Sequence, residues 1–280
     1  MTQIVKVACL QMNSGPNVSD NIATVEAALS AKPDLDILML PENFAQMPAS
    51  KAEQYSEYQL DGEVQRTLSQ FASHFHVNIL AGSLAIRDSQ DSKPFARSLL
   101  FNTQGEQVGQ YDKLHLFDVD TQAQARSRYR ESDTYLAGPV SKTQLSPVAL
   151  QIGQSTVQVG QTICYDLRFP ELYRTLAAQG AQVICVPSAF TYETGQAHWE
   201  TLLRARAIEN QVFVVAPAQS GKHASGRKTW GNSMIVDPWG AVLAQKNTGE
   251  GLVFAELDLT TIESLRARFP VHQHKRLQPN

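Results

Sequence analysis

The chain has 280 residues, 42% of them hydrophobic and 18% charged, which is typical of a globular protein with a sizeable core and excludes a disordered chain. Its 24 basic and 27 acidic side chains give a net charge of −3 without any block of like charge, so we expect no nucleic-acid partner and no membrane partner. No basic, apolar signal segment opens the sequence, and the odd count of three cysteines favours reduced thiols. We therefore predict a cytoplasmic protein.

Apolar runs of strand length recur along the whole chain. In chain order the predicted strands are Ile4–Gln11, Ile37–Leu40, Asn78–Ala85, Ala96–Asn102, Thr156–Cys164, Val183–Val186, Val212–Ala216, Asn232–Val236 and Leu252–Leu257. Segments with helical spacing or helix boundary signals lie between several of these runs. The predicted helices are Asn21–Leu29, Glu63–His74, Pro170–Gln179 and Ala197–Glu209.

The two halves of the chain repeat one order of elements. Each half runs strand, helix, strand, helix, strand and then a hairpin, with turn residues at Thr103–Gly105 and Asp237–Gly240. The second strand of each half stops at a proline, Pro41 or Pro187. If the halves are equivalent, they form two mixed sheets packed face to face with helices outside, an α/β protein with a four-layer α-β-β-α sandwich. Sites in open α/β sheets form where the carboxyl ends of the strands gather.

No linker-like stretch divides the sequence. We predict one domain over residues 1–280, with a C-terminal tail that leaves the globule from about residue 270. The least regular segment is 118–155, which is polar around Thr121–Arg130. We interpret this segment as a surface excursion and as a candidate cover for a site.

Three residues at or just beyond predicted strands have the chemistry of a thiol hydrolase. Cys164 ends a predicted strand, Glu42 follows Leu-Pro, and Lys113 follows Tyr-Asp after the first hairpin. A cysteine attacks faster when a base takes its proton or a cation stabilises the thiolate. Glu42 is the candidate base, and a dry pocket is expected to raise its pKa towards neutrality. Lys113 and the backbone N–H of Tyr165 are candidate donors to an oxyanion.

Each of these residues also has an ordinary structural interpretation. Taken singly, Cys164 is equally consistent with core filling. A lone glutamate such as Glu42 is more often a charge at a helix N-terminus than a base, and Lys113 is by default a solvated surface lysine. Cys9 and Cys185 lie inside apolar runs, so we expect them to be buried filler.

Other polar groups indicate binding less directly. Arg168, Arg204 and Arg206 are candidates for holding a substrate carboxylate, although an ion pair with a neighbouring acid is the plainer use of Arg168. His272 and His274 form a pair without further ligands nearby. The sequence has no GxGxxG after a strand, no Walker motif, no HExxH and no CxxC, so we expect neither a cofactor nor a metal.

Three stretches in order carry a family resemblance. LPENF at 40–44, YDKLHLFDVD at 111–120 and ICYDLRFPELYR at 163–174 resemble the catalytic motifs of the nitrilase, or carbon–nitrogen hydrolase, superfamily. Further matches at 187–221 and 231–240 extend the resemblance over nearly the whole chain. This resemblance implies hydrolysis of an amide bond through a thioester, on an α-β-β-α sandwich that pairs into a homodimer.

The resemblance also implies roles for individual residues. Glu42, Lys113 and Cys164 match the positions of a catalytic Glu-Lys-Cys triad, and Glu131 matches a further glutamate that orients the lysine and the substrate. Tyr165 follows the nucleophile as a supporting residue. No metal and no cofactor enters this chemistry.

Two branches of the superfamily are similar to this chain. PSAF at 187–190, the stretch 195–209 and AQSGKH at 218–223 resemble the amidase branch that converts deaminated glutathione to 2-oxoglutarate and cysteinylglycine. The omega-amidase branch, which acts on 2-oxoglutaramate or 2-oxosuccinamate, is similar through the cysteine motif and AHWE at 197–200. The expected partner is therefore a small-molecule amide.

Two other classes of function stay open at this point. A metal-dependent phosphoesterase also uses an α-β-β-α sandwich, and Glu42, Asp166, Asn232 and Asp237 are its candidate ligands here. That interpretation leaves the cysteine and the lysine without a role. A binding module that kept the fold without catalysis is the third class.

Overall fold

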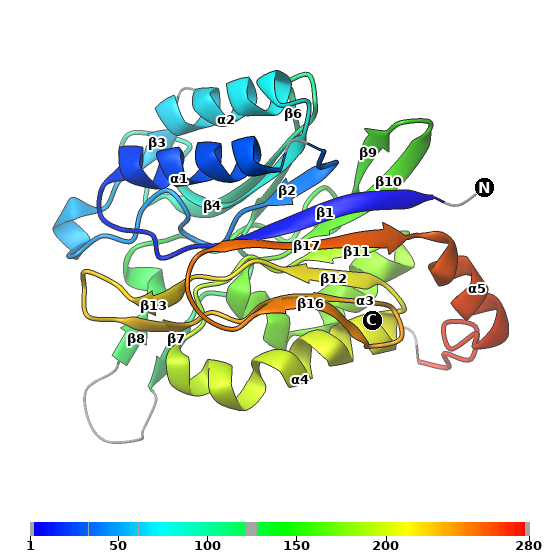
Figure 1. The fold of residues 1–280 in the computed structure, drawn as a ribbon. Helices are drawn as coiled ribbons and strands as arrows, with labels where there is room; N and C mark the ends of the chain where they lie inside the picture. The colour runs from blue at the N-terminus through cyan, green and yellow to red at the C-terminus, as the bar shows by residue number, and fades with distance from the viewer. Residues whose placement is uncertain (1–2, 33, 61, 121–127, 278–280) are drawn as a thin grey trace.

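The computed structural model describes residues 3–32, 34–60, 62–120 and 128–277. Two mixed β-sheets lie at its centre, with helices on both outer faces (Figure 1). The first sheet, in spatial order, consists of β17 (Gly251–Asp258), β1 (Ile4–Gln11), β2 (Ile37–Met39), β4 (Asn78–Arg87), β5 (Phe95–Phe101) and β6 (Gln107–Asp112), with β3 (Glu57–Tyr58) beside β4. The second consists of β16 (Val242–Lys246), β15 (Ser233–Val236), β12 (Phe213–Ala216), β11 (Val183–Cys185), β10 (Ser155–Gln161) and β9 (Val148–Ile152).

The alternation of side chains along β1 shows how the layers form. Val5, Val7 and Cys9 belong to the core between the two sheets, whereas Ala8 and Leu10 belong to the core beneath the helices. Successive strand residues point to opposite faces, so a strand that is apolar throughout must be covered on both sides. Helices α1 (Val18–Ala31) and α2 (Glu63–His74) cover the first sheet, and α3 (Pro170–Ala178) and α4 (Tyr192–Asn210) cover the second (Figure 1). The predicted α-β-β-α sandwich is confirmed.

The repeat of the two halves is also present in the sheets. In each sheet the first three strands of the half pair in parallel, β1–β2–β4 and β10–β11–β12, and an antiparallel hairpin follows. The turns of the two hairpins contain Gly105 and Gly240, whose φ angles of 81° and 91° favour glycine. Leu40–Glu42 after β2 and Val186–Ser188 after β11 therefore lie at the same edge of the sandwich, in equivalent positions.

Helix α4 begins five residues before the predicted start at Ala197. Gly195 in its first turn weakens the helical pattern of the sequence, because glycine is a poor helix former. A Cβ atom at this position would lie 2.3 Å from the Cβ of Trp230. The glycine is therefore a packing requirement, which the local sequence does not reveal.

The prediction that Cys164 ends a strand is wrong. Strand β10 ends at Gln161, and Cys164 opens the 3-10 helix η3 (Cys164–Arg168). The side chain of Asp166 accepts a hydrogen bond of 2.8 Å from the Ile163 N–H and turns the chain at this point. The apolar pattern continues past the strand, so periodicity alone places the boundary too late.

The segment 118–155 is more ordered than predicted. It contains the hairpin of β7 (Asp118–Asp120) and β8 (Arg128–Arg130), the 3-10 helix η2 (Glu131–Asp133), and β9, which is an edge strand of the second sheet. Most of the polar stretch predicted around Thr121–Arg130 lies outside the described residues. Short polar strands give little signal in the sequence, because partners distant in the chain hold them in place.

The C-terminal residues follow α5 (Thr260–Arg268). The Phe269 carbonyl accepts a 2.8 Å hydrogen bond from Gln211 Nε2, and His272 Nε2 lies 3.0 Å from the Asn210 carbonyl. The first tail residues thus lie against the end of α4, while residues 273–277 are exposed. None of the helices within the described ranges has both the length and the apolarity to cross a membrane.

Candidate active site

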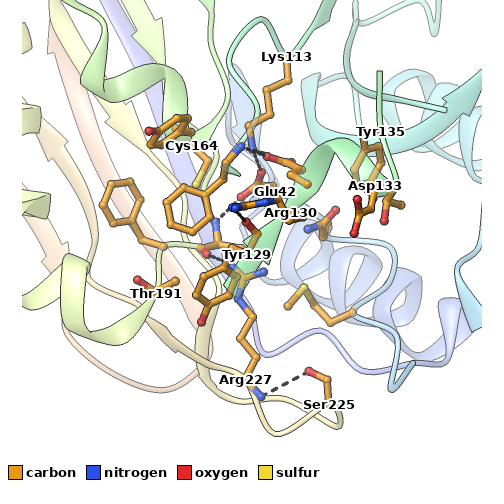
Figure 2. A pocket seen from close by; sticks show the side chains of 18 of the residues that line it. Glu42, Lys113, Tyr129, Arg130, Asp133, Tyr135, Cys164, Thr191, Ser225 and Arg227 are labelled. Atoms are coloured by element: carbon orange, nitrogen blue, oxygen red, sulfur yellow. Dashed lines mark hydrogen bonds and ion pairs between the residues drawn. The ribbon is translucent and has the colours of Figure 1, made fainter. Parts of the chain in front are cut away.

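Loops at one edge of the sandwich bring the three predicted catalytic residues together (Figure 2). Glu42 follows β2 and Lys113 follows β6 in the first sheet, while Cys164 follows β10 in the second. Lys113 Nζ lies 2.7 Å from Glu42 Oε1, and the charges of both residues act on the pKa of the Cys164 thiol. The three side chains line the same cavity, which has a volume of about 670 Å³. This volume is in the range of small-molecule sites.

Lys113 is a buried ammonium group between two carboxylates. Its side chain is only 2% exposed, and Nζ lies 2.7 Å from Glu42 Oε1 and 2.8 and 2.9 Å from the two carboxylate oxygens of Glu131. Burial alone would lower the pKa of Lys113, but the charges of Glu131 and Glu42 outweigh it and raise this pKa well above its ordinary value. The lysine is therefore charged and is not the solvated surface lysine of the alternative interpretation.

Glu42 is held from both sides of its carboxylate. Oε1 accepts a hydrogen bond from Lys113 and Oε2 accepts one of 2.7 Å from the backbone N–H of Ala189. Burial alone would raise the pKa of Glu42, but the Lys113 ammonium outweighs burial and holds this pKa below its ordinary value. The expected upward shift is thus wrong. At rest Glu42 is an ionised carboxylate in the cavity that Cys164 also lines.

Glu131 lies on the other side of the lysine. Its Oε2 accepts a 2.7 Å hydrogen bond from the backbone N–H of Phe117, in addition to the contacts with Lys113. Burial, together with the charge of Glu42, raises the pKa of Glu131 even though Lys113 opposes the shift. Both oxygens of Glu131 bind Lys113, and its role in orienting the lysine stays a prediction.

Cys164 has an unusual backbone conformation. Its φ is +47°, in the left-handed region that a cysteine seldom adopts, and its N–H donates to the Pro187 carbonyl at 2.9 Å. Such a conformation costs about 1–3 kcal/mol and persists only where its surroundings impose it. Burial, and then the charge of Glu42, raises the pKa of the Cys164 thiol. At rest Cys164 is a neutral thiol, 8% exposed at the cavity.

Asp166 joins the lysine segment to the cysteine turn. This fully buried carboxylate accepts hydrogen bonds from the Tyr111 hydroxyl at 2.7 Å and from the backbone N–H groups of Ile163 and His115 at 2.8 and 3.1 Å. The His115 ring contributes a fourth contact, with Nδ1 at 2.7 Å, and stacks on Phe169 at 3.6 Å. The sequence places Asp166 in a motif but not at the centre of this network.

Tyr165 places both a ring and a backbone amide at the site. The ring packs edge-on against Phe117 and Phe169, with centroids 5.0 and 5.4 Å apart, and lines the cavity. The amide lies in the first turn of η3, where helical N–H groups have no intrahelical acceptor. Its role as an oxyanion donor stays a prediction.

Sequence reasoning did not single out several residues that line the cavity, although all but Arg227 lie in segments expected to shape it. They include Gln54, Tyr129, Arg130, Phe190 and Arg227. Arg227 lies between the short strands β13 (Ser220–Lys222) and β14 (Lys228–Trp230), in a polar stretch without periodicity. Only its positive charge in a loop could have drawn attention to it.

Of the three arginines proposed as carboxylate ligands, only Arg168 lines the cavity. Arg206 donates to the Leu167 carbonyl and pairs with Glu209, and Arg204 donates to the Gly240 carbonyl. These two guanidinium groups serve the packing of α4. The expected ion pair of Arg168 with a neighbouring acid is replaced by a contact with His198 at 3.3 Å.

The proposed metal ligands do not form a site. Both carboxylate oxygens of Asp166 already accept hydrogen bonds from protein groups. Asp237 Oδ1 accepts hydrogen bonds from the backbone N–H groups of Trp239 and Ala241 in a turn. Across the part of the chain that the structure describes, no three His, Cys, Asp or Glu side chains are grouped as metal ligands would be. Nothing in the geometry therefore favours the phosphoesterase interpretation.

Comparison with known proteins agrees with this geometry. Residues 6–267 match the family model described as carbon-nitrogen hydrolase. The chain belongs to the carbon–nitrogen hydrolase family. A deaminated glutathione amidase of Yersinia enterocolitica is 42% identical over 276 residues, covering 96% of this chain and 92% of the relative. One from Rattus norvegicus is 38% identical over 276 residues, covering 96% and 82%.

Solved structures of relatives have the same fold. The NitFhit protein of Caenorhabditis elegans superposes with a TM-score of 0.88 at 37% identity, covering 98% of this hydrolase and 66% of that chain. Nit3 of Saccharomyces cerevisiae, described as a member of branch 10 of the nitrilase superfamily, superposes with a TM-score of 0.83 at 31% identity, covering 98% and 97%. The resemblance seen in three motifs is thus confirmed over nearly the whole chain, and the protein is a hydrolase of carbon–nitrogen bonds.

Proposed function

We propose that this carbon–nitrogen hydrolase cleaves deaminated glutathione to 2-oxoglutarate and cysteinylglycine, with Cys164 as nucleophile, Glu42 as acid and base, and Lys113 as oxyanion donor. The observation that carries the proposal is that Cys164 lines the same cavity of about 670 Å³ as the Glu42–Lys113 ion pair, whose Nζ–Oε1 distance is 2.7 Å. Relatives named for this substrate, at 38–42% identity, support the choice of substrate.

The first step follows from the protonation states. The Cys164 thiol resists ionisation, since burial and the charge of Glu42 raise its pKa. Transfer of the thiol proton to Glu42 must therefore accompany attack of sulfur on the amide carbon, as the negative charge passes to the amide oxygen. A positioned base of this kind contributes about 10²–10⁴-fold to the rate.

The later steps use the same three groups. Lys113 Nζ and the Tyr165 N–H stabilise the oxyanion, and loss of one such donor typically costs about 2.7–4 kcal/mol. Glu42 gives its proton to the departing amine, the C–N bond breaks, and a thioester to Cys164 remains. Water then loses a proton to Glu42, attacks the thioester and releases the carboxylic acid, and the thiol recovers its proton.

Glu131 keeps the lysine in place during these steps. Lys113 needs a fixed position because Glu42 alternates between charged and neutral forms. Glu131 binds Nζ through both oxygens and is itself anchored to the Phe117 N–H, so the ammonium keeps a partner when Glu42 is protonated. We therefore assign Glu131 a positioning role.

An activity panel tests the substrate. Purified protein is assayed with deaminated glutathione, 2-oxoglutaramate, a simple nitrile and an N-carbamoyl amino acid. We expect the highest kcat/KM for deaminated glutathione. A higher value for 2-oxoglutaramate would replace the proposal by the omega-amidase alternative, and turnover of nitriles alone would reject an amidase.

A pair of cysteine variants tests the nucleophile in the same assay. Cys164→Ala should abolish turnover, while Cys185→Ala, which changes a thiol buried between the sheets, should keep it. Activity retained in folded Cys164→Ala would reject the mechanism.

We further propose that the chain is one domain, acts as a homodimer and resides in the cytoplasm. The dimer rests on the family resemblance, and the location rests on three cysteines that are all free and buried. Light scattering after size-exclusion chromatography should give twice the chain mass of 30.9 kDa. A mass of one chain at micromolar concentration would reject the dimer.

A further inference from the structure

Two arginines of the cavity form no ion pair with a carboxylate of the described residues, although the charge of Arg227 contributes to the lowered pKa of Glu42. They are Arg168 and Arg227, both in the cavity wall. The other cations of the cavity are paired, since Lys113 lies between two glutamates and Arg130 Nη2 lies 3.3 Å from Asp120. The two guanidinium groups are therefore left to act on whatever fills the cavity.

Arg227 is the deeper of the two. Its Nη2 donates to the Ala189 carbonyl, and its guanidinium lies 5.7 Å from the centre of the Tyr129 ring. Its Nε is buried without a hydrogen-bond partner among the described residues. A buried donor that stays unpaired is costly, so a ligand atom is the natural partner. Figure 2 shows the side chain reaching from the β13–β14 turn towards Tyr129.

Arg168 lies closer to solvent. Its two Nη atoms lie 3.3 and 3.4 Å from His198 Nδ1 in an exposed contact, and its guanidinium lies 5.4 Å from the centre of the Phe190 ring. Aromatic faces hold a guanidinium while leaving its edge free for bidentate hydrogen bonds. Carboxylates are the ligands that fit such an edge.

We propose that Arg227 and Arg168 bind two carboxylates of one substrate, Arg227 on the acyl side of the scissile amide and Arg168 on the amine side. The substrate class is then an ω-amide of a 2-oxo dicarboxylic acid whose amine portion also ends in a carboxylate. This inference rests on the proposed function, because deaminated glutathione has this pattern of charge.

The position of each arginine relative to the triad decides the assignment. Ala189 donates its N–H to Glu42 and offers its carbonyl to Arg227, so one residue connects this arginine to the catalytic base. The acyl portion stays bound as the thioester and needs a deep anchor. The amine portion must depart to solvent, which suits the half-buried Arg168, whose contact with His198 lies at the surface.

Two substrates separate the two roles. 2-Oxoglutaramate carries the acyl-side carboxylate but releases ammonia, so it has nothing for Arg168 to bind. Arg227→Met should lower kcat/KM for both amides by about 10–100-fold, and Arg168→Met should do so only for deaminated glutathione. Arg204→Met, on α4 and outside the cavity, is the matched control and should change neither. Equal losses on both substrates from both variants, or the reverse pattern, would overturn the assignment.

Inhibition by the product 2-oxoglutarate shows whether Arg227 binds the substrate carboxylate or acts only indirectly, through Glu42. The inhibition constant of 2-oxoglutarate should rise about 10–100-fold in Arg227→Met and stay unchanged in Arg168→Met. Arg227→Lys should recover part of this affinity. An unchanged inhibition constant in Arg227→Met would overturn the role of Arg227 as a ligand.

Alkylation of Cys164 tests the charges of Arg168 and Arg227 without requiring hydrolysis of an amide substrate. The rate with iodoacetate, divided by the rate with neutral iodoacetamide, should fall several-fold in both variants. If neither amide is hydrolysed but this ratio falls, the proposed function fails and the carboxylate sites stand. If both amides are hydrolysed and the ratio is unchanged, the proposed function stands and this inference fails.

Discussion

Replacing Asp166 by asparagine isolates the network that joins the Lys113 segment to the Cys164 turn. The carboxylate accepts four hydrogen bonds, and two of them come from the backbone N–H groups of Ile163 and His115, one on each oxygen. An asparagine has only one acceptor oxygen. Whichever way the amide is turned, one of these N–H groups faces an NH₂ donor and loses its partner.

The expected losses of stability and rate follow from the number of hydrogen bonds that the substitution removes. A buried donor left unpaired costs about 1–3 kcal/mol, and the remaining bonds lose the strengthening that a charged acceptor supplies. We expect Asp166→Asn to lower the free energy of unfolding by about 2–4 kcal/mol. Movement of the lysine segment by about 1 Å relative to the cysteine can cost on the order of 10²-fold in rate. We expect kcat to fall about 10–100-fold, with little change in KM.

The assay pairs steady-state kinetics with thermal unfolding. Asp237→Asn is the control, because its carboxylate also accepts two backbone N–H groups in a turn but lies outside the cavity. Both N–H groups bind the single oxygen Oδ1, which asparagine keeps, so the control should leave no donor unpaired and should retain kcat. Wild-type kcat in folded Asp166→Asn, or an equal loss of kcat in the control, would refute the positioning argument.

Three further changes test separate parts of the account. Glu42→Gln should lower kcat by about 10²–10⁴-fold while near-ultraviolet circular dichroism stays native, and unimpaired turnover would remove Glu42 as the base. Gly82→Ala should destabilise the fold by about 1–3 kcal/mol or more and also reduce activity, because its Cβ would lie 1.9 Å from the Pro41 carbonyl oxygen next to Glu42. Gly15→Ala, which has no atom within 4 Å of the new Cβ, is the neutral control in denaturant titrations. Alkylation of Cys164 by iodoacetamide should show no inflection near pH 8.5, since burial and the charge of Glu42 raise the pKa of this thiol. Loss of that charge in Glu42→Gln should move the titration to lower pH, and an ordinary thiol curve in the wild type would contradict this electrostatic picture.

Much of the fold could be read from the sequence, because its long elements carry strong local signals. Strand β1 and helix α2 have the bounds that their apolar periodicity predicts. Short strands such as β13 and β14 were missed, since two or three polar residues have no periodicity and depend on distant contacts. The bridge of Met12 with Gln219, near the entry to β13, joins positions more than two hundred residues apart.

The motifs predicted that Glu42, Lys113 and Cys164 come together, which the structure shows, but they did not predict the electrostatics of the three groups. The upward shift expected for the pKa of Glu42 assumed burial without a neighbour, whereas the ammonium of Lys113 lies 2.7 Å away. The contacts of Asp166 and Arg227 could not be predicted from the sequence either. Their partners Tyr111 and Ala189 lie 55 and 38 positions away, and only the folded chain brings them together.

The thioester on Cys164 is the central chemical claim, and trapping it is the most direct test. Enzyme mixed with deaminated glutathione is quenched in acid within one turnover, digested and analysed by mass spectrometry. The account predicts a hydroxylamine-sensitive 2-oxoglutaryl group on the Cys164 peptide and none on the peptides of Cys9 and Cys185. Rapid turnover without any adduct on Cys164, together with full activity of Cys164→Ala, would contradict it.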